Sequence, residues 1–406
     1  MTTPLTIEMD LVFTTPAFLG DAMQQAELRP QSFKGGLRFW YRAIDAQLAK
    51  PDDDVGNDNR KPHNKAREDT IWGGAGDNFG QSKVLLRIPN SKRPSLWKWD
   101  RHQFDRFTPG RGRNTRNGVL YLGYPFGLKG NQKRNALVQG TSFKLQAVIP
   151  RSGSLKEWEI HAIIASLWIF SVLGSCGTRS RRGFGSLQAT NWRLLNPNGN
   201  RDWEEAFEAL PMPSEMNQPD RWKDGIQKAC GQFRDWFGRF PSNTAHPHIY
   251  EDFAPKILDG FPSWEEALNH AGSKMQAFRH RYQPDYDLVM DLLQHPAHGK
   301  TSPGRVTFGL PLTFRFGSRS SLGNVTFYPQ GLHPAYKAPE RFASLLFLKV
   351  VMFDRYYYPV FFRLGGELPG FDIPMRCYKR NHNKMELNMA LPSRENNAMK
   401  IFFDSL

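Results

Sequence analysis

The sequence predicts an α+β protein whose strands and helices are distributed over two successive domains. Three observations support this prediction. Apolar and polar residues alternate over several short runs, as in half-buried strands, and longer segments place apolar residues at helical spacing. The chain has 406 residues, which corresponds to about two or three domains. Its hydrophobic fraction of 39%, with 30 Phe and 11 Trp, is sufficient for folded cores.

In the first half, the pattern predicts a regular succession of elements. Residues 5–14 alternate as a strand, which Thr15 and Pro16 end, and Ser32 is placed to cap a helix over residues 33–49. Further strands are expected at 82–88, 119–124, 141–149 and 186–194, and an apolar helix is expected at 156–173. With one strand to spare, the order strand, helix, strand, strand, helix, strand is close to the ferredoxin-like pattern.

The second half is less regular, and helices precede strands in it. Helices are expected at 202–210, 220–240 and 264–281, where Ser263 and Glu266 form a capping box. Strands are expected at 305–316, 325–328, 342–353 and 357–364, and the polar segment 379–393 is expected to be loose. We therefore divide the chain into domains 1–195 and 196–406, with a mobile insertion at about 51–69 and a helical insertion at about 200–300.

The positive charge is concentrated in the first half. The chain has 54 Lys and Arg against 39 Asp and Glu, a formal charge of +15, of which residues 1–195 carry +13 and residues 196–406 carry +2. Residues 101–134 contain eight basic residues and a single acidic one, Asp105. This asymmetry indicates a polyanionic partner for the first half, although a solvated basic surface gives the same count.

Several classes of protein are excluded by simple features. Cys176, Cys230 and Cys377 lie far apart without metal-ligand spacing, which argues against a disulfide framework and against a zinc site. The longest apolar run, residues 160–174, is too short and too polar to span a membrane, and the N-terminus has no signal-peptide pattern. We expect a soluble cytoplasmic protein without metal or cofactor.

Two basic constellations have spacings that suit a nucleic acid. Lys34, Arg38 and Arg42 share one face of a helix, rising about 6 Å per step, so they can follow a phosphodiester backbone. Gly35 and Gly36 are expected in the first helical turn, where a phosphate can approach free amides. The alternative is a solvated basic face whose glycines serve packing.

The second constellation is a glycine- and arginine-rich loop at residues 174–185, between an apolar helix and a strand. Arg179, Arg181 and Arg182 offer forked guanidinium donors for phosphates, and Phe184 either stacks on a base or packs inward. The loop is not a Walker motif because it lacks the Gly-Lys-Ser/Thr ending and follows a helix. The alternative is a flexible surface loop.

Catalytic candidates are weak. His161 lies in the apolar helix, where a core or interface role is expected, and His63 lies in the polar insertion. The remaining histidines that merit consideration lie in loops near prolines, at positions 246, 248, 295 and 298. The run Asp52-Asp53-Asp54 reads as a solvated charge run in preference to a cation site.

The motifs together resemble those of a known family. They are TPAFLG at 15–20, ELRP at 27–30, SFKGGLRFWYR at 32–42, IWGG at 71–74 and RRGFGS at 181–186. These resemble the RAMP superfamily of CRISPR-associated proteins. The run LRFWYR, with FGLPL at 308–312 and RFASLLFL at 341–348, is most similar to the first-subunit family of the type III-B (Cmr) effector complex.

The resemblance implies two tandem ferredoxin-like (RRM-like, βαββαβ) domains and a place among other Cmr subunits around a CRISPR RNA. It implies a non-catalytic subunit that helps to hold target RNA near the 3′ part of the guide, away from any membrane, for antiviral defence. We expect RNA contacts from twelve residues in the two constellations. They are Arg29, Lys34, Gly35, Gly36, Arg38, Trp40, Arg42, Arg179, Arg181, Arg182, Gly183 and Phe184.

Two further hypotheses stay open at the level of sequence. One is a metal-independent RAMP endoribonuclease that processes CRISPR RNA with His161 or another histidine as general base. The other is a protein-interaction subunit whose basic half binds acidic neighbours. The loop at 317–323 has one arginine and two glycines, so it is a poor match to a second RNA-gripping loop.

Overall fold

The structure is a computed structural model in which two compact units are distinguished. It describes residues 3–20, 25–49, 65–74, 80–89, 94–108, 117–128, 134–241, 244, 246–315, 324–329, 342–366, 375–379 and 386–406. Unit 1 comprises Met1–Ser242, His248–Ser273 and Phe347–Phe362, and unit 2 comprises Asn243–Pro247, Lys274–Leu346 and Arg363–Leu406. Both units combine helices and strands, which confirms the α+β class. Unit 1 extends beyond residue 195, and the tandem ferredoxin-like arrangement stays a prediction.

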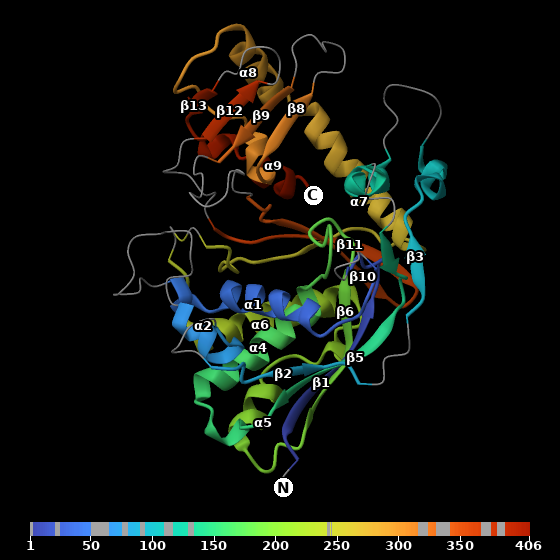
Figure 1. The fold of residues 1–406 in the computed structure, drawn as a ribbon, viewed down its shortest axis with the longest axis vertical. Coiled ribbons are helices and arrows are strands. Elements are labelled where there is room, and N and C mark those ends of the chain that lie inside the picture. The colour runs from blue at the N-terminus through green and yellow to red at the C-terminus, as the bar shows by residue number, and fades with distance from the viewer. Residues whose placement is uncertain are drawn as a thin grey trace. The chain divides into compact units, whose positions relative to one another are not determined.

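The main sheet of unit 1 has four antiparallel strands in the order β2, β5, β1, β6. Its strands are β1 (Leu5–Phe13), β2 (Leu85–Arg87), β5 (Ser142–Ile149) and β6 (Leu187–Leu195), and its helices are α1 (Gln31–Ile44) and α4 (Glu157–Leu173). Both helices pack on one face of the sheet (Figure 1), where Phe33 of α1 contacts Phe143 and Phe170. Along the chain these elements follow the predicted order strand, helix, strand, strand, helix, strand.

The burial pattern explains why these segments form these elements. In β1, Ile7, Met9 and Leu11 are buried beneath the helices, whereas Glu8 and Asp10 lie on the opposite face. Helix α1 is amphipathic, and its apolar side is buried. Helix α4 is apolar around its whole circumference because it also contacts α5 and α6.

The remaining elements of unit 1 surround this sheet and its helices. They are η1 (Ala46–Ala49), α2 (Lys65–Trp72), β3 (Leu96–Lys98), η2 (Arg101–Phe107), α3 (Gly118–Leu122), η3 (Tyr124–Gly127), β4 (Asn135–Leu137), η4 (Ser152–Ser154), α5 (Arg201–Glu208), η5 (Pro213–Glu215), α6 (Pro219–Phe237), β7 (Lys256–Ile257), β10 (Leu346–Phe353) and β11 (Tyr356–Arg363). Strands β3 and β4 pair with each other, and β10, β11 and β7 form a second sheet. Helix α7 (Trp264–Arg281) and the ends of β10 and β11 include residues of both units.

Strand β10 is attached to the segment around β6 through side chains. The Gln188 side chain donates to the Met352 carbonyl and accepts from the Met352 amide, both at 2.8 Å, as a peptide group would. Ser186 Oγ accepts a hydrogen bond from the Val350 amide at 3.0 Å, and Thr14 Oγ1 donates to the Val350 carbonyl at 2.6 Å. These bonds satisfy backbone groups of Val350 and Met352 inside unit 1.

Unit 2 is built around an antiparallel sheet in the order β13, β12, β9, β8. Its elements are α8 (Gln283–Gln294), η6 (Gly304–Phe308), β8 (Leu312–Arg315), β9 (Asn324–Tyr328), β12 (Met375–Lys379), β13 (Glu386–Met389), η8 (Arg394–Asn396) and α9 (Ala398–Asp404). The apolar side of α8, including Val289 and Leu292, joins Val325 and Phe327 in the core. The Asp285 carboxylate accepts from the Gly304 amide at 2.6 Å and from the Arg305 amide and Nε, each at 2.9 Å.

One predicted strand and one predicted helix start are wrong. Residues 119–122, expected as part of a strand, lie in helix α3, because the Asn117 side chain accepts from the Leu120 amide at 3.0 Å and caps it, and Tyr124 begins the short helix η3. Helix α1 begins at Gln31, with Pro30 at the N-cap and no side-chain cap, so Ser32 does not cap it. In the sequence, a short apolar run that follows an asparagine cap has the same alternating pattern as a strand.

Predictions in the second half need similar correction. The segment 305–316 is the short helix η6 followed by β8, and β10 begins only at Leu346. The polar segment 379–393 contains β13, where Leu387 and Met389 are buried in the unit 2 core. Residues 65–69 of the expected insertion begin helix α2, and residues 50–64 lie outside the described residues.

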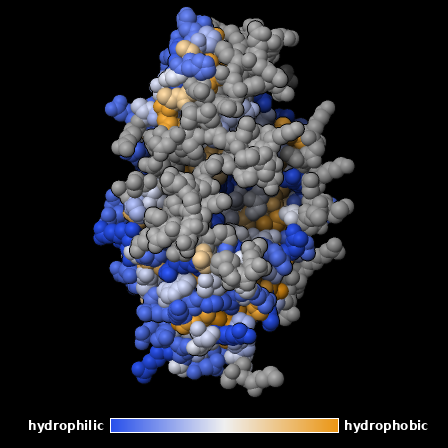
Figure 2. Space-filling model, turned by 60° about the vertical axis from the view of Figure 1, so that its left-hand side comes forward, coloured by the Kyte–Doolittle hydropathy of each residue, from blue (hydrophilic) through white to orange (hydrophobic). Residues whose placement is uncertain are grey.

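The described surface is polar. In Figure 2 the coloured residues on the side shown are mostly hydrophilic, with small separate hydrophobic areas, because the large apolar side chains are buried. Among the described helices, none has the length and apolar character needed to cross a membrane.

Candidate nucleic-acid interface

Lys34, Arg38 and Arg42 lie along α1, and acidic residues of α2 form ion pairs with Arg38 and Arg42. Arg38 donates to the Glu68 carboxylate through Nε, to Asp69 Oδ1 at 2.8 Å and to the Gly73 carbonyl at 3.0 Å. Arg42 Nη1 lies 2.9 Å from Glu68 Oε1. The spacing therefore predicts the shared helix face correctly, but not the carboxylates that fold onto it.

These ion pairs are structural in character. Glu68 and Asp69 are each only 1% exposed. A buried carboxylate that loses its cation is destabilising by about 3–5 kcal/mol, so Arg38 and Arg42 hold α2 against α1. Among the described residues, Lys34, Arg38 and Arg42 of α1 face Glu68 and Asp69, and these five side chains carry a net charge of one positive unit.

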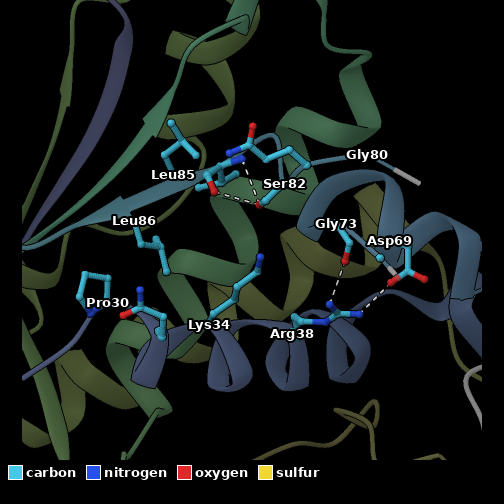
Figure 3. Close-up of a pocket in the computed structure, with 13 residues that line it drawn as sticks. Pro30, Lys34, Arg38, Asp69, Gly73, Gly80, Ser82, Leu85 and Leu86 are labelled. Atoms are coloured by element: carbon cyan, nitrogen blue, oxygen red, sulfur yellow. Dashed lines mark hydrogen bonds and ion pairs between the residues drawn. The ribbon is translucent and has the colours of Figure 1, made fainter. Parts of the chain in front are cut away.

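That charge belongs to Lys34. Among the described residues it forms no ion pair. Burial, reinforced by the neighbouring Arg38, lowers the pKa of its amine below the ordinary value. In Figure 3 its side chain rises from α1 toward the space between Leu86 and Ser82. An amine in this position is available to an anion.

The space is a cavity of about 700 Å³ within unit 1. It is bordered by the beginning of α1, the end of α2 with the residues after it, and β2. Its lining consists of Pro30, Gln31, Lys34, Arg38, Asp69, Gly73, Gly74, Gly80, Gln81, Ser82, Val84, Leu85 and Leu86 (Figure 3). The walls thus combine two cations, backbone groups and one apolar side.

The two glycines of α1 have different surroundings. Because α1 begins at Gln31, Gly35 and Gly36 lie in its second turn instead of its first, where amides bond within the helix. A Cβ at Gly36 would lie 2.5 Å from the Phe170 ring, so this glycine allows α1 and α4 to pack closely. A Cβ at Gly35 would meet nothing within 4 Å.

Two further predicted residues of this segment contact protein. Trp40 is 3% exposed and packs against Phe347 and Phe362. Arg29 donates from Nη2 to the Gly20 carbonyl at 3.0 Å and pairs with Glu27 at 3.2 Å. The Trp40 ring is therefore part of the core, and its role in RNA binding stays a prediction.

The glycine- and arginine-rich loop is a compact structure. The Cys176 amide donates to the Gly185 carbonyl at 2.8 Å, and Thr15 Oγ1 donates to the Gly183 carbonyl at 2.7 Å. Gly183 has φ +88°, and a Cβ there would lie 2.3 Å from Leu268. The glycines are thus explained by close packing and backbone conformation.

The loop arginines are held to different degrees. The Arg181 guanidinium lies 4.6 Å from the Phe347 ring centroid and 5.1 Å from that of Phe39, and burial lowers its pKa to about 10. Arg179 Nε donates to the Leu122 carbonyl at 2.7 Å. Arg182 is partly exposed, and its backbone pairs with Leu348.

Phe184 packs inward. Its ring is fully buried within an aromatic cluster. The rings within 6.4 Å of it are those of Phe18, Trp99, Phe126 and Trp264. The sequence left stacking and packing open, and in this conformation the ring packs.

The two basic groups face different sides of α1. Arg38 and Arg42 point to α2, whereas Phe39, one residue from Arg38 and hence about 100° around the helix, contacts Arg181. The structure places both groups in unit 1, on different sides of α1.

Residues 10–188 match the sequence model of the RAMP superfamily, a span that contains both basic groups. The matched span is a RAMP-like region. The chain is 28% identical over 206 residues to the CRISPR system Cmr subunit Cmr1-1 of Pyrococcus furiosus, an alignment that covers 50% of this chain and 49% of the relative. The aligned segment thus spans about half the length of the curated relative it matches.

Solved structures share the fold over a longer span. The crystal structure of Cmr1 from Pyrococcus furiosus in the apo form aligns with a TM-score of 0.56 and 15% identity, covering 98% of this chain and 96% of that chain. A chain of the cryo-EM structure of the type III-B Cmr-beta complex bound to cognate target RNA aligns with a TM-score of 0.52 and 13% identity, covering 89% and 95%. At these identities the likeness establishes the fold.

A buried lysine that the sequence analysis did not single out also supports the glycine-rich loop. Lys349 of β10 is 1% exposed, and its amine donates to the Gly174 carbonyl at 2.7 Å and to the Leu187 carbonyl. Burial lowers the pKa of Lys349 to about 7, and the nearby Cys176 opposes this weakly. The signal in the sequence is one lysine within the apolar strand LFLKVVMF.

Three histidines of the described residues are engaged by neighbouring side chains. His161 stacks on Trp236 with centroids 4.3 Å apart, and burial lowers its pKa. His248 stacks on Phe240, and His295 lies 3.0 Å from Asp291 on the surface. In the described part of the chain, no three His, Cys, Asp or Glu side chains are placed to hold a metal. His63 and residues 52–54 lie outside this part.

The basic stretch at 101–134 is described only in part. Arg101 and Arg106 of η2 are exposed, and Arg106 lies over the Phe107 ring at 4.7 Å. Residues 109–116 and 129–133, which carry most of its charge, lie outside the described residues.

Proposed function

We propose that this protein is a non-catalytic RNA-binding subunit of a type III-B CRISPR (Cmr) effector complex. In this role it helps to hold target RNA near the 3′ part of the CRISPR RNA, together with other Cmr subunits in the cytoplasm. The observation that carries the proposal is the uncompensated amine of Lys34 in an open cavity of the basic unit 1. The 28% identity to a Cmr1 subunit over 206 residues supports it.

RNA affinity as a function of salt concentration tests the proposal. Each cation that neutralises a phosphate of single-stranded RNA contributes about −0.7 to the slope of log K against log salt. We expect Lys34→Met to reduce the magnitude of this slope by about 0.7, equally for RNAs of different sequence, because phosphates carry no sequence information. Lys228→Met, an exposed lysine of α6, is the matched control and should leave the slope unchanged.

The result that contradicts the proposal is RNA binding that neither depends on salt nor responds to Lys34→Met. Membership of the complex is tested separately by co-purification with tagged Cmr subunits and CRISPR RNA. The endonuclease alternative predicts cleavage of labelled repeat RNA in EDTA that a single His→Ala change abolishes. We expect the RNA to stay intact, because His161 is engaged by Trp236.

A further inference from the structure

The cavity beside α1 divides into a basic part and an apolar part. Lys34 and Arg38 form its basic side, and Pro30, Leu85 and Leu86 contribute apolar surface. Its volume of about 700 Å³ lies within the range of sites that enclose small organic molecules. A ligand that fills both parts therefore needs an anionic group joined to an apolar, flat or compact group.

The charge of the cavity limits the anion. Of the described residues that line the cavity, Lys34 and Arg38 are cationic and Asp69 is anionic, so their net charge is one positive unit. A phosphodiester carries one negative charge, whereas a terminal phosphate carries about 1.5–2 negative charges at pH 7. The internal phosphate of a nucleotide chain matches the cavity better than a free nucleotide does.

Arg38, Gly73 and Gly74 in the wall of the cavity are held by contacts within the protein. Arg38 is held by two carboxylates and the Gly73 carbonyl. Gly73 and Gly74 fit tightly, because a Cβ at Gly73 would lie 2.9 Å from the Ser82 amide nitrogen and one at Gly74 would lie 2.6 Å from Asp69 Cγ. Little ordering free energy is lost on binding to such a site.

We propose that this cavity binds a single unpaired ribonucleotide unit through its internal phosphodiester, with the phosphate on Lys34 and the base against Pro30 and Leu86. The inference rests on the proposed RNA-binding function and specifies one site for it. The nucleotide must be unpaired, because a base within a duplex is stacked and cannot lie against a protein wall. Arg38 is already paired with Glu68 and Asp69 and therefore acts as a positioning residue.

The test uses the full-length chain and the dinucleoside phosphate UpU, which has one phosphodiester and two bases. Protection of Lys34 from acetylation by increasing UpU, measured by mass spectrometry, reports occupancy at this amine. We expect concentration-dependent protection of Lys34 and none of Lys228. In binding titrations, Lys34→Met should weaken UpU binding about tenfold, the effect of losing one charge-assisted contact.

Two further experiments test what the base and the charge of the ligand contribute to binding. A ribose phosphodiester without bases should protect Lys34 clearly less than UpU, and uridine monophosphate should not exceed UpU. Leu86→Glu places an acidic group in the apolar wall at a partly exposed position and should abolish UpU binding while the unfolding midpoint is retained. Equal protection by UpU and by the base-free diester would overturn the assignment of the base.

The failures of the two proposals are distinguishable. If long RNA binds with the expected salt dependence but UpU leaves Lys34 unprotected, the cavity assignment is refuted and the proposed function stands. If neither RNA nor UpU binds, both are refuted. Protection of Lys34 by inorganic phosphate as strong as that by UpU would identify a general anion site and overturn the inference.

Discussion

The burial of the Lys349 amine predicts how the stability of unit 1 depends on pH. Its two hydrogen-bond acceptors are backbone carbonyls of Gly174 and Leu187, and a neutral amine has two N–H groups, enough for both. Burial lowers the pKa of Lys349 from 10.5 to about 7. In the unfolded chain the amine stays protonated up to about pH 10.4.

The sign and size of the effect follow from proton counting. Between pH 7 and pH 10.5 the unfolded chain binds more protons than the folded one, so the free energy of unfolding increases with pH in this window. The slope approaches about 1.4 kcal/mol per pH unit, and integration between pH 7 and pH 9 gives about 2 kcal/mol. Lys349→Met removes this contribution.

The assay is chemical denaturation followed by tryptophan fluorescence at several pH values. The wild type should gain about 2 kcal/mol between pH 7 and pH 9 relative to Lys349→Met. The difference between the two proteins reports Lys349 together with its interaction with Cys176, whose pKa burial raises to about 12. Lys228→Met should follow the wild type. Parallel curves for wild type and Lys349→Met would refute the account.

Three further predictions concern other parts of the fold. A hydrogen bond from Lys144 is the main reason that the pKa of Glu8 is lowered to about 2. Glu8→Gln should therefore lower the free energy of unfolding near pH 6 by up to about 3 kcal/mol. In acid-unfolding curves, this difference between wild type and variant should disappear as the pH falls from 4.5 through 2. Gly36→Ala should cost about 1–3 kcal/mol in thermal unfolding through its clash with Phe170, whereas Gly35→Ala, in open space, should stabilise α1 by up to about 1 kcal/mol; equal effects would contradict the packing assignment. Asp285→Asn should selectively expose unit 2 amides to hydrogen exchange at a cost of about 2–4 kcal/mol, because the buried carboxylate holds η6, and unchanged exchange there would refute this role.

Periodicity alone predicted the main sheet of unit 1 and its two helices. It succeeded there because each element buries one continuous apolar face, as Ile7, Met9 and Leu11 do in β1. It failed at 119–124, because the five residues of α3 are too few to separate a strand from one capped helical turn. It also missed β13, whose buried residues Leu387 and Met389 are surrounded by polar neighbours.

For the candidate site, the sequence predicted where the cations lie but not their partners. The spacing of Lys34, Arg38 and Arg42 determines a shared helix face, because helical geometry is local. Glu68 and Asp69 neutralise two of these cations from a different helix, and a long-range contact of this kind has no local signature. Sequence motifs indicate the family resemblance, whereas only the three-dimensional structure shows that Lys34 differs from Arg38 and Arg42 in its ion pairing.

The side-chain attachment of β10 also determines when unit 1 can be completed during synthesis. The bond between Gln188 and Met352 spans 164 residues, and that between Thr14 and Val350 spans 336. At ribosomal rates of about 5–20 residues per second, β6 waits roughly 10–30 s for its partner. An uncovered strand edge is a template for wrong pairing during that interval. A nascent chain ending before β10 should therefore depend on a chaperone or on an early partner to stay unaggregated.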